Sequence, residues 1–431
     1  MASQRPDVDV DVAVVGAGPA GSAAAISLAR AGARVAVVDK ATFPRDKCCG
    51  DGLTTGALRL LEQLGVSPLA LPSWHPVDAA WIRSPSGRVV ELPLPEGHGV
   101  YAGIARRAEL DALLVDRARA AGAAVHEGAV LIGARQATDT ITLDVDGLGT
   151  VVARIAIGAD GMWSPLRKAL GASEPGYLGE WHAFRQYFSG VGPAAASQLW
   201  VWFERDLLPG YAWSFPLGDR RANVGFGIPR GGAIATQEMK QLWPDLLARP
   251  HVRAVLGEHA VAEAPHKAWP IPARIGELAL SRGRALFVGD AAGATDRLTG
   301  EGIGQAMLTG VLAAGAILDR GPHDAPGVAA TYERAVRREL VADHRMSVAL
   351  GKILERPNGA RGAIRVAALS GWTRRNFGRW LFEDEPRGVL LTPRRWHRHF
   401  LDRDGAFATA VGTRPAAFTP TTQGGNAASV P

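Results

Sequence analysis

The sequence predicts an α/β fold in which a nucleotide-binding domain carries an inserted, mostly antiparallel β-domain and a helical C-terminal region. Three observations support this prediction. The chain opens with a strand, a glycine-rich turn, a helix and a second strand, which is the order of a βαβ unit. Residues 71–100 and 171–265 are rich in tryptophan, proline and β-forming residues. A helical pattern then runs from Pro326 to about Leu354, with the proline suited to a first helical position.

Composition limits the class of protein. The chain has 431 residues, 47% of them hydrophobic, which is enough for one large unit or two interlocked domains. The net charge is +6, and only six of the 48 basic residues are lysines. This richness in arginine is typical of a GC-rich bacterial genome, and we expect no nucleic acid partner.

Neither disulfides nor membrane spans are expected. The two cysteines, Cys48 and Cys49, are adjacent, so an ordinary bridge between them would distort the backbone. Free thiols fit a reducing cytosol. No secretory signal is recognised, and no run approaches the roughly 20 apolar residues of a membrane-spanning helix. We therefore expect a cytoplasmic protein, either soluble or peripheral on the inner face of the cell membrane, and no metal site.

The first sixty residues predict a dinucleotide site. Residues 8–15 are expected to form a buried strand, residues 22–31 a helix of small side chains, and residues 34–38 a second strand. A G-x-G-x-x-G turn joins the first strand to the helix, and Asp39 closes the second strand. Strand, glycines, helix and terminal acid agree, which makes this signal far stronger than a lone glycine motif.

Each residue type in this unit has a physical task. Gly16 permits the tight turn, Gly18 lets the backbone approach a pyrophosphate, and Gly21 permits close packing of the helix on the sheet. The free N–H groups at the start of the helix attract phosphate, and Asp39 is placed to accept hydrogen bonds from ribose hydroxyls. The expected cofactor contacts here are Gly16, Gly18, Pro19, Ala20, Gly21, Asp39 and Lys40.

Two later segments indicate FAD rather than a nicotinamide cofactor. In IAIGADGMWSPLRKALG a strand ends at Asp160-Gly161, and Ser164 and Arg167 stand at a helix start. In ALFVGDAAGATDRLTGEGIGQAM a strand over 285–288 ends at Gly289-Asp290, and a helix begins near Gly302. The N-terminus of that helix suits the electron-rich pyrimidine edge of a flavin. The expected contacts from these segments are Asp160, Gly161, Gly289, Asp290, Gly300, Gly302 and Ile303.

Together these three motifs resemble the FAD-containing oxidoreductases of the aromatic-hydroxylase type. The resemblance covers the chain up to about residue 330 and implies a split FAD-binding domain with an inserted substrate domain. It also implies that an arginine of GIARRAELDALL lies near the cofactor. The spacing R-x-x-L-D favours Arg107 over Arg106, whereas the alternative interpretation is surface charge at a helix start.

Two further stretches resemble the geranylgeranyl reductase family within that superfamily. They are FPRDKCCGDGL, where Cys49 directly precedes Gly50, and LPGYAWSFPLG. The resemblance implies that the cysteine-glycine loop, with Cys49 and Gly50, lies beside the flavin. It also implies that a hairpin over residues 208–227 lines a pocket for a long isoprenoid chain. The expected substrate contacts are Tyr211, Trp213, Phe215, Pro216 and Gly225, with Asn223 and Gly227 shaping the wall.

The residue pattern agrees with this implication. Tyr211, Trp213 and Phe215 alternate, so they lie on one face of a strand and suit an apolar, flexible chain. The alternative is that they form ordinary β-domain core. A thiol beside an alkene could donate a proton, or the two cysteines could be small buried hydrophobes. The candidate proton donors are Cys49, a water molecule and Tyr211, in that order.

We therefore expect an FAD-dependent reductase that saturates isoprenoid double bonds, with hydride from N5 of the reduced flavin. Substrates would be geranylgeranyl or polyprenyl groups of diphosphates, lipids, chlorophyll precursors or quinones, with a menaquinone side chain the most attractive. The electron donor would be NADPH or a ferredoxin, because FAD takes the one dinucleotide fingerprint. The alternative is an FAD-dependent monooxygenase of an apolar or aromatic substrate, and a third hypothesis is a prenyl-lipid carrier. The absence of lysine between Cys48 and Arg167 argues against a flavin halogenase.

The expected domain division, and the residues at its C-terminal end, complete the prediction. FAD-binding segments are 1–70, 100–170 and 266–335, substrate-binding segments are 71–99 and 171–265, the helical region is 336–404, and 405–431 is a disordered tail. Residues 361–404 hold ten arginines against five acids, interleaved with aromatics. This pattern fits either a surface that meets anionic lipid or a helical cap whose aromatics pack inward. The reductase family usually has a proline shortly before G-E-G-I, where this chain has Arg297 and Leu298.

Overall fold

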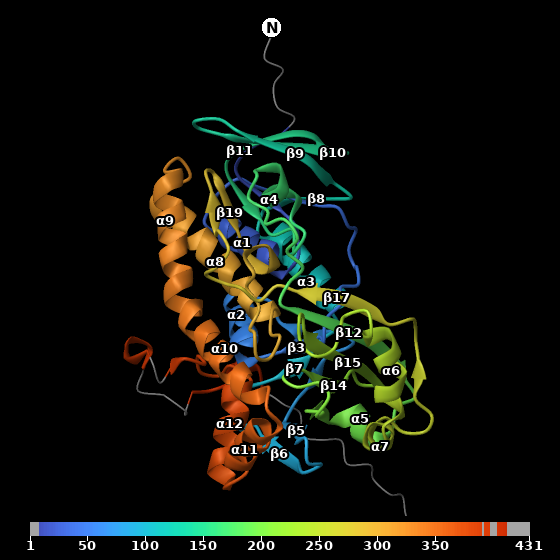
Figure 1. Ribbon diagram of the computed structural model, residues 1–431. Coiled ribbons are helices and arrows are strands. Elements are labelled where there is room, and N and C mark those ends of the chain that lie inside the picture. The colour runs from blue at the N-terminus through green and yellow to red at the C-terminus, as the bar shows by residue number, and fades with distance from the viewer. Residues whose placement is uncertain (1–7, 390–391, 397–402, 412–431) are drawn as a thin grey trace, which may run out of the picture.

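The computed structural model describes residues 8–389, 392–396 and 403–411. Figure 1 shows an elongated molecule, whose described residues form two large β-sheets and one small one. One end holds an α/β layer, and the other holds the second sheet and the C-terminal helices. The α/β class, the inserted β-sheet and the helical C-terminal region are as predicted.

The first sheet has the order β18-β19-β11-β1-β2-β8, in which the pairs from β19 to β8 are parallel and β18 pairs antiparallel with β19. The antiparallel strands β10 and β9 are attached through β11. Its central strands are nearly continuous runs of valine, isoleucine and alanine because helices and loops cover both faces. The strands are β1 (Val8–Val15), β2 (Val35–Asp39), β8 (Ala124–Glu127), β9 (Val130–Gln136), β10 (Ile141–Asp146), β11 (Gly149–Gly158), β18 (Ser281–Arg282) and β19 (Ala285–Phe287).

Small residues let two helices pack closely beside this sheet. Helix α1 (Pro19–Arg30) is rich in alanine, and it lies against α8 (Ile303–Arg320). A Cβ atom added at Gly310 of α8 would lie 2.2 Å from the backbone oxygen of Ala20, so the two backbones touch at this point. The other helices of this part are α2 (Thr55–Gln63), α3 (Arg107–Ala120), α4 (Pro165–Ala169) and α9 (Ala325–Val336), with the short helical turns Pro68–Ala70 and Gly289–Ala292.

The second sheet has the order β16-β12-β15-β14-β13-β5-β6, with β17 also paired to β12. Every pair is antiparallel except β13 with β5. The strands are β5 (Ala79–Arg83), β6 (Val89–Pro93), β12 (Trp181–Ser189), β13 (Leu199–Trp202), β14 (Tyr211–Pro216), β15 (Arg221–Pro229), β16 (Val261–Ala262) and β17 (Lys267–Ile271). Because β17 belongs here, this sheet extends past residue 265, where the substrate segment was expected to end. A small third sheet joins β3 (Gly52–Leu53), β7 (Gly103–Ile104) and β4 (His75–Pro76).

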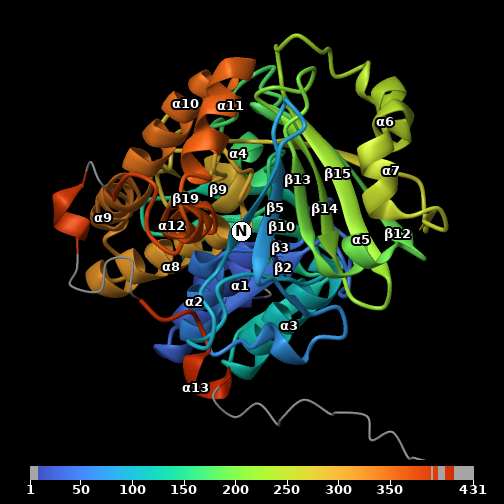
Figure 2. The same ribbon diagram turned by 90° about the horizontal axis from the view of Figure 1, so that it is seen from below.

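One face of the second sheet is covered by three helices, as Figure 2 shows. They are α5 (Pro193–Ser197), α6 (Met239–Ala248) and α7 (Pro250–Leu256). Phe226 of the sheet stacks on Trp243 of α6 within a buried apolar cluster on this face. The opposite face carries Tyr211 and Phe215, which lie in a different apolar cluster.

The C-terminal region is helical; α12 packs against β6 of the second sheet, and Asp384 pairs with Arg59 of α2. Helix α9 continues through one π-helical turn (Arg337–Val341) into α10 (Ala342–Leu354), and α11 (Pro357–Ala367), α12 (Gly371–Leu381) and α13 (Ala408–Val411) follow. Pro393–Arg395 forms a single helical turn. Within the described residues, no helix is both long and apolar enough to cross a bilayer.

The start of the expected disordered tail is ordered. Val100 and Ala406 exchange backbone hydrogen bonds of 2.8 and 2.9 Å, and the Phe407 amide donates to Glu62. The prediction of disorder from residue 405 is therefore wrong for 405–411, because backbone pairing compensates for the low charge that suggested disorder. Residues 412–431 lie outside the described part.

Candidate functional site

The turn between β1 and α1 is as tight as its glycines predict. Gly16 has a φ of +102°, and a Cβ there would lie 2.3 Å from the backbone oxygen of Ala159. A Cβ at Gly21 would lie 1.8 Å from the oxygen of Gly16. The Asp39 carboxylate accepts a 2.7 Å hydrogen bond from the Ala17 amide, so the acid at the end of β2 lies beside the turn. Lys40 follows it as an exposed residue.

The start of α1 suits a pyrophosphate. Gly18 is the N-cap and supplies no side-chain cap, with Pro19 and Ala20 following in the first turn. The open side of Gly18 faces the guanidinium of Arg45, whose Nη2 lies 3.5 Å from where a Cβ would stand. Arg45 in turn pairs with Asp111 of α3 at 2.8 Å. Helix amides and an arginine thus converge where an anion would bind. Arg45 was not among the expected contacts, although it stands in the FPRDK stretch.

The Asp160-Gly161 segment lies against the same turn. A Cβ added at Gly16 would lie 3.0 Å from the Asp160 backbone nitrogen, and the Asp160 carboxylate accepts from the Leu166 amide. Burial raises the pKa of Asp160 to about 6. Ser164 caps α4 as expected, whereas the Arg167 guanidinium donates to the backbone oxygens of Ala279 and Ala291. Arg167 therefore ties two loops together rather than facing a ligand.

The Gly289-Asp290 segment lies between α1 and α8. Gly289 has a φ of +57°, its amide donates to the Thr309 hydroxyl, and a Cβ there would lie 3.0 Å from that of Ala20. The Lys47 ammonium lies 3.9 Å from the Asp290 carboxylate and 3.8 Å from the ring centre of Trp269. Burial lowers the pKa of Lys47. This lysine is a site neighbour that the sequence did not reveal.

A carboxylate lies at the start of α8, the helix end that was expected to face the flavin. The Glu301 carboxylate accepts hydrogen bonds from the amides of Gly304 (2.7 Å) and Gln305 (3.3 Å). Gly302 is the N-cap, and Ile303 begins the helix as a buried residue. The Glu301 side chain therefore already satisfies two of the first amides of α8. Burial raises the pKa of Glu301, which favours its neutral form.

A buried ion pair holds the loop where the usual proline is missing. One oxygen of Asp296 accepts from the amides of Leu298 and Thr299 at 3.0 and 2.8 Å. The other oxygen lies 3.1 Å from the Arg387 guanidinium, which comes from the C-terminal region. Arg387 and Asp296 are almost completely buried, so the carboxylate and its arginine supply the order that a proline would give.

The loop that carries the cysteines is fixed by residues from both domains. Asp51 is buried with a φ of +65°, accepts hydrogen bonds from the Tyr187 hydroxyl and the Asn223 amide, and also accepts from the Arg107 backbone. Burial raises the pKa of Asp51. Tyr187 and Asp51 were not among the expected site residues. The left-handed backbone at Asp51 carries no motif signal of its own, because aspartate tolerates it.

The two candidate arginines, Arg106 and Arg107, lie in different surroundings. The Arg107 side chain is buried, forms a two-pronged pair with Asp111 at 2.8 Å, and lies next to the Cys49 thiol. Arg106 instead pairs with Glu263 at 3.1 Å and covers the Tyr187 ring. Arg107, which the R-x-x-L-D spacing favoured, is therefore the buried one of the two arginines.

The thiols of Cys48 and Cys49 are both free and partly buried. Burial raises the pKa of Cys48 to about 12 and also raises that of Cys49, where Arg107 opposes the shift. The Cys48 thiol donates to the Lys267 backbone oxygen at 3.5 Å, so it turns toward β17. The Cys49 thiol accepts a 3.4 Å hydrogen bond from the Asp51 amide. Its cationic partner is Arg107, a contact that the sequence could not show.

The aromatic residues Tyr211, Trp213 and Phe215 of β14, here called the aromatic row, lie on one face as predicted. Their successive ring centres are 6.1 and 6.0 Å apart. A Cβ added at Gly225 would lie 2.3 Å from the Trp213 ring, so only glycine fits there. Pro216 ends the strand as a buried residue.

The aromatic row touches both loops assigned to the cofactor. A Cβ at Gly50 would lie 3.2 Å from the Phe215 ring and 3.7 Å from the Trp213 nitrogen. A Cβ at Gly300 would lie 3.5 Å from the Tyr211 hydroxyl, which donates its hydrogen bond to the backbone oxygen of Thr299. Segments separated by more than two hundred residues in the sequence thus meet at one place.

The residues present fit FAD. The glycine turn, the uncapped start of α1 and Arg45 suit its pyrophosphate, Asp39 suits its adenosine ribose, and Asp290 suits the ribityl chain. The Cys49 loop and the Gly300 loop stand where the aromatic row meets the first domain. A separate cavity of about 770 Å³ between α2, α8 and the C-terminal segment is lined mostly by charged and polar groups, among them Arg59, Asp343 and Arg395. Its polarity does not suit an apolar chain.

Comparison with known proteins agrees with this geometry. A family model described as FAD binding domain matches residues 9–317. Menaquinone reductase of Mycobacterium tuberculosis is 35% identical over 333 residues, covering 72% of this chain and 76% of the relative. Digeranylgeranylglycerophospholipid reductase 1 of Methanopyrus kandleri is 32% identical over 322 residues, covering 71% and 80%. A geranylgeranyl bacteriochlorophyll reductase-like structure from Thermoplasma acidophilum has a TM-score of 0.75 at 21% identity, covering 90% and 100%.

Proposed function

This chain belongs to the FAD binding domain family of oxidoreductases, and we propose that it saturates carbon–carbon double bonds of an isoprenoid chain. One observation carries the proposal. The aromatic row packs directly on the Cys49-Gly50 loop and on the Gly300 loop, so an apolar wall adjoins the proposed flavin site. A polyprenyl chain is the kind of substrate that such a wall accommodates.

The protein's main contribution is to hold an unreactive alkene in place. When bound, reduced FAD supplies a hydride to one alkene carbon. The aromatic row aligns the chain, because an isolated double bond reacts only when it is held close and correctly oriented. Tyr211 is locked by its hydrogen bond to Thr299, which favours a positioning role for this residue over proton donation.

Cys49 is the proton donor we favour. Its raised pKa keeps the thiol protonated at neutral pH, so the proton is available. When the proton passes to the second alkene carbon, the S–H bond breaks and a C–H bond forms. The thiolate that remains lies beside the Arg107 guanidinium, which stabilises its charge until solvent returns a proton.

The substrate class rests on the relatives and on the aromatic row. Menaquinone and geranylgeranyl lipids are the substrates we propose, with the menaquinone side chain first, because a relative with 35% identity is named menaquinone reductase. The electron donor is NADPH or a ferredoxin. Such lipids reside in membranes, so we propose that the enzyme works at the inner face of the cell membrane.

An anaerobic half-reaction tests the proposed function. The FAD-loaded protein is photoreduced without oxygen and mixed with menaquinone or a geranylgeranyl phospholipid. We expect the flavin to reoxidise and the lipid to gain two hydrogen atoms, as measured by mass spectrometry. Reoxidation that requires oxygen, with a gain of one oxygen atom, would instead show a monooxygenase. Flavin that stays reduced with every prenyl lipid would indicate a carrier.

A further inference from the structure

The corner between α11 and α12 exposes an unusual group of apolar side chains. Val366, Leu369 and Trp372 are 61%, 71% and 61% exposed. Leu369 and Trp372 flank Ser370, whose capping box with Thr373 fixes the start of α12. These three side chains therefore stand on a rigid corner rather than on a loose loop, and we call them the apolar tip.

The other side of α11 is buried. Ala360, Ile364 and Ala367 recur at helical spacing and pack inward, whereas Val366 lies on the outer face. The inner side of α11 thus already packs against the core. The apolar tip is additional to the packing that folds the region.

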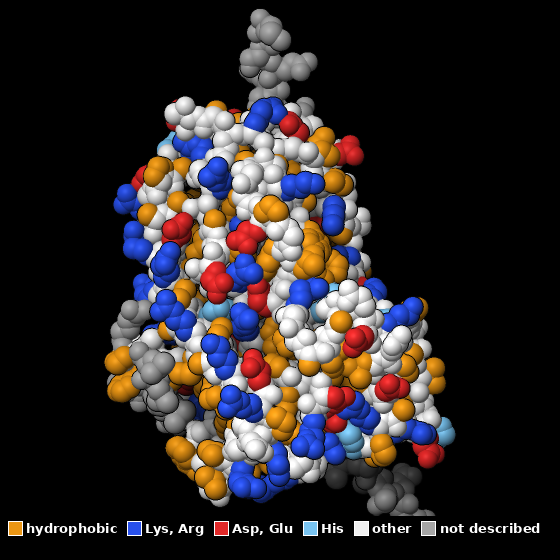
Figure 3. Space-filling model, viewed as in Figure 1, with side chains coloured by type: hydrophobic (Ala, Val, Ile, Leu, Met, Phe, Trp, Pro, Cys, Tyr) orange, Lys and Arg blue, Asp and Glu red, His pale blue; other side chains and the backbone are white. Residues whose placement is uncertain are grey.

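Basic side chains surround the apolar tip. Residues 352–376 contain six Lys and Arg residues and one acid, Glu355. The exposed arginines closest in sequence to the tip are Arg361, Arg365, Arg374 and Arg375. Figure 3 shows hydrophobic and basic side chains together at the lower end of the molecule, where Figure 1 places α11 and α12.

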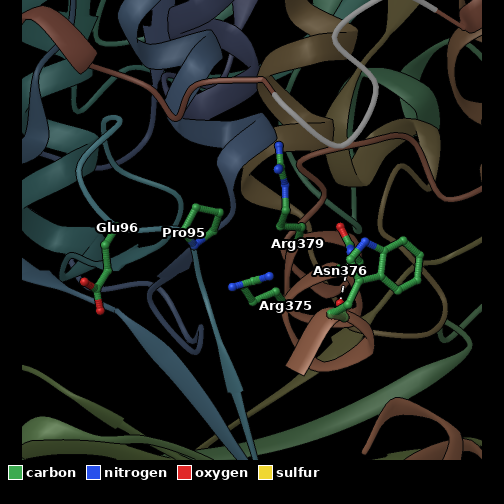
Figure 4. Close-up of a pocket in the computed structure, with 6 residues that line it drawn as sticks. Pro95, Glu96, Arg375, Asn376 and Arg379 are labelled. Atoms are coloured by element: carbon green, nitrogen blue, oxygen red, sulfur yellow. Dashed lines mark hydrogen bonds between the residues drawn. The ribbon is translucent and has the colours of Figure 1, made fainter. Parts of the chain in front are cut away.

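A small pocket beside the tip adds to this basic character. It has a volume of about 360 Å³, and Trp372, Arg375 and Asn376 line it together with Pro95 and Glu96 at the end of β6. Arg375 extends from α12 toward the Pro95 segment (Figure 4). Arg379 also lines the pocket, so its two arginines outnumber its one acid, Glu96.

We propose that the apolar tip and its arginines form a docking surface for an anionic lipid membrane. Tryptophan and leucine insert at the level of the lipid headgroups, while arginines bind the phosphates around them. The excess of one charge sign favours an anionic surface over a second copy of this chain, because a second copy would present the same positive charge.

Exposure alone does not make such a surface, and the opposite end of the molecule shows the difference. Ile132 of β9 is 71% exposed, as much as Leu369. Its surroundings on β9 and β10 carry charges of both signs, including the exposed pair of Arg135 with Asp144. The apolar tip is distinguished by its predominantly basic surround.

The surface also connects to the proposed substrate wall, and this part of the inference rests on the proposed function. Ile364 and Ala367, on the inner side of α11, belong to the same apolar cluster as Tyr211 and Phe215 of the aromatic row. Continuous apolar packing therefore leads from the membrane-facing corner to the reacting end.

Vesicle flotation tests the docking surface without any need for turnover. The FAD-loaded protein is mixed with vesicles of phosphatidylcholine alone or of phosphatidylcholine and phosphatidylglycerol in equal parts. We expect binding to the anionic vesicles only, weakened by added salt. The double variant Leu369→Asp/Trp372→Ala should bind about tenfold more weakly, and Arg365→Glu about fivefold more weakly. The matched controls Ile132→Asp and Arg282→Glu, at the other end of the molecule, should bind like the unaltered protein.

Several results would overturn the proposal. These are equal binding to neutral and anionic vesicles, equal losses in the controls, or no loss in the tip variants. A shift from dimer to monomer in Leu369→Asp, with lipid binding unchanged, would show a protein interface instead. Flavin content and thermal unfolding of each variant show whether it is folded. Failure of the reductase assay would leave these outcomes unaffected, because flotation measures binding only.

Discussion

The side-chain nitrogen of Asn223 donates a 2.8 Å hydrogen bond to the backbone oxygen of Cys49. The same nitrogen donates to Asp51 at 2.8 Å, and the oxygen of Asn223 accepts from the Trp213 indole at 3.1 Å. One amide on β15 thus fixes the cysteine loop, a buried acid and the aromatic row with respect to one another. The relative position of the two proposed site halves depends on this residue.

Replacement of Asn223 by alanine should therefore cost both stability and turnover. Three buried partners lose a hydrogen bond, and each orphaned group costs about 1–3 kcal/mol. We expect the free energy of unfolding, measured by urea denaturation, to fall by roughly 2 kcal/mol or more. Asn358→Ala, at an exposed position, is the control and should change it by less than about 0.5 kcal/mol. If Asn223→Ala leaves the free energy of unfolding unchanged, the network does not hold the loop.

Gly18→Ala should separate cofactor affinity from folding. The nearest atom to the added Cβ is the flexible end of Arg45 at 3.5 Å, so the backbone accommodates the change. The methyl group nevertheless enters the space proposed for the pyrophosphate. We expect FAD affinity, measured by flavin fluorescence, to fall about tenfold or more while thermal unfolding of the apoprotein stays nearly constant.

The control for this change is Gly315→Ala in α8, where an added Cβ meets nothing within 4 Å. This substitution should leave FAD affinity unchanged and stabilise the helix by up to about 1 kcal/mol. If both variants bind FAD equally well, the pyrophosphate does not lie at Gly18.

The adjacent cysteines provide a matched test of proton donation. Cys49→Ala removes the thiol beside Arg107 and should lower isoprenoid reduction about a hundredfold, within the range of lost acid–base catalysis, while flavin content stays normal. Cys48→Ala removes a thiol that turns toward Lys267 and should stay within about twofold of the unaltered rate. Equal rates for the two variants would remove Cys49 from the mechanism and favour a water molecule as the donor.

Glu383 should make stability depend on pH. Burial raises its pKa from an ordinary value of 4.5 to about 8 in the folded protein. Between these values the folded protein retains a proton that the unfolded chain has lost, so a rise in pH favours unfolding. Glu383→Gln removes this effect. The free energy of unfolding of this variant, relative to that of the unaltered protein, should therefore rise between about pH 4.5 and about pH 8, by at most roughly 1.4 kcal/mol per pH unit.

Urea denaturation of both proteins across this pH range is the measurement. Glu355→Gln, which removes an exposed carboxylate of the same type, should show a difference from the unaltered protein that varies little with pH. If the difference in free energy of unfolding between Glu383→Gln and the unaltered protein also varies little with pH, the Glu383 carboxylate is already ionised in the folded protein.

Sequence alone identified the motifs whose information is local. The strand from Val8 to Val15, the start of α8 after Gly302 and the alternation of Tyr211, Trp213 and Phe215 follow from periodicity and glycine chemistry over short stretches. Those same stretches carry the family resemblance. Fold class, cofactor and the aromatic face were therefore predictable, because backbone sterics and alternation act between near neighbours.

Tertiary structure alone decided which distant residues meet. Arg45 at the open side of Gly18, Arg107 beside Cys49, Asn223 on the cysteine loop and Arg387 on Asp296 all join residues far apart in the chain. The physical reason is that burial and long-range pairing depend on how elements pack, which no local pattern encodes. The same packing left Val366, Leu369 and Trp372 at the surface, where their hydrophobicity alone would have placed them in the core.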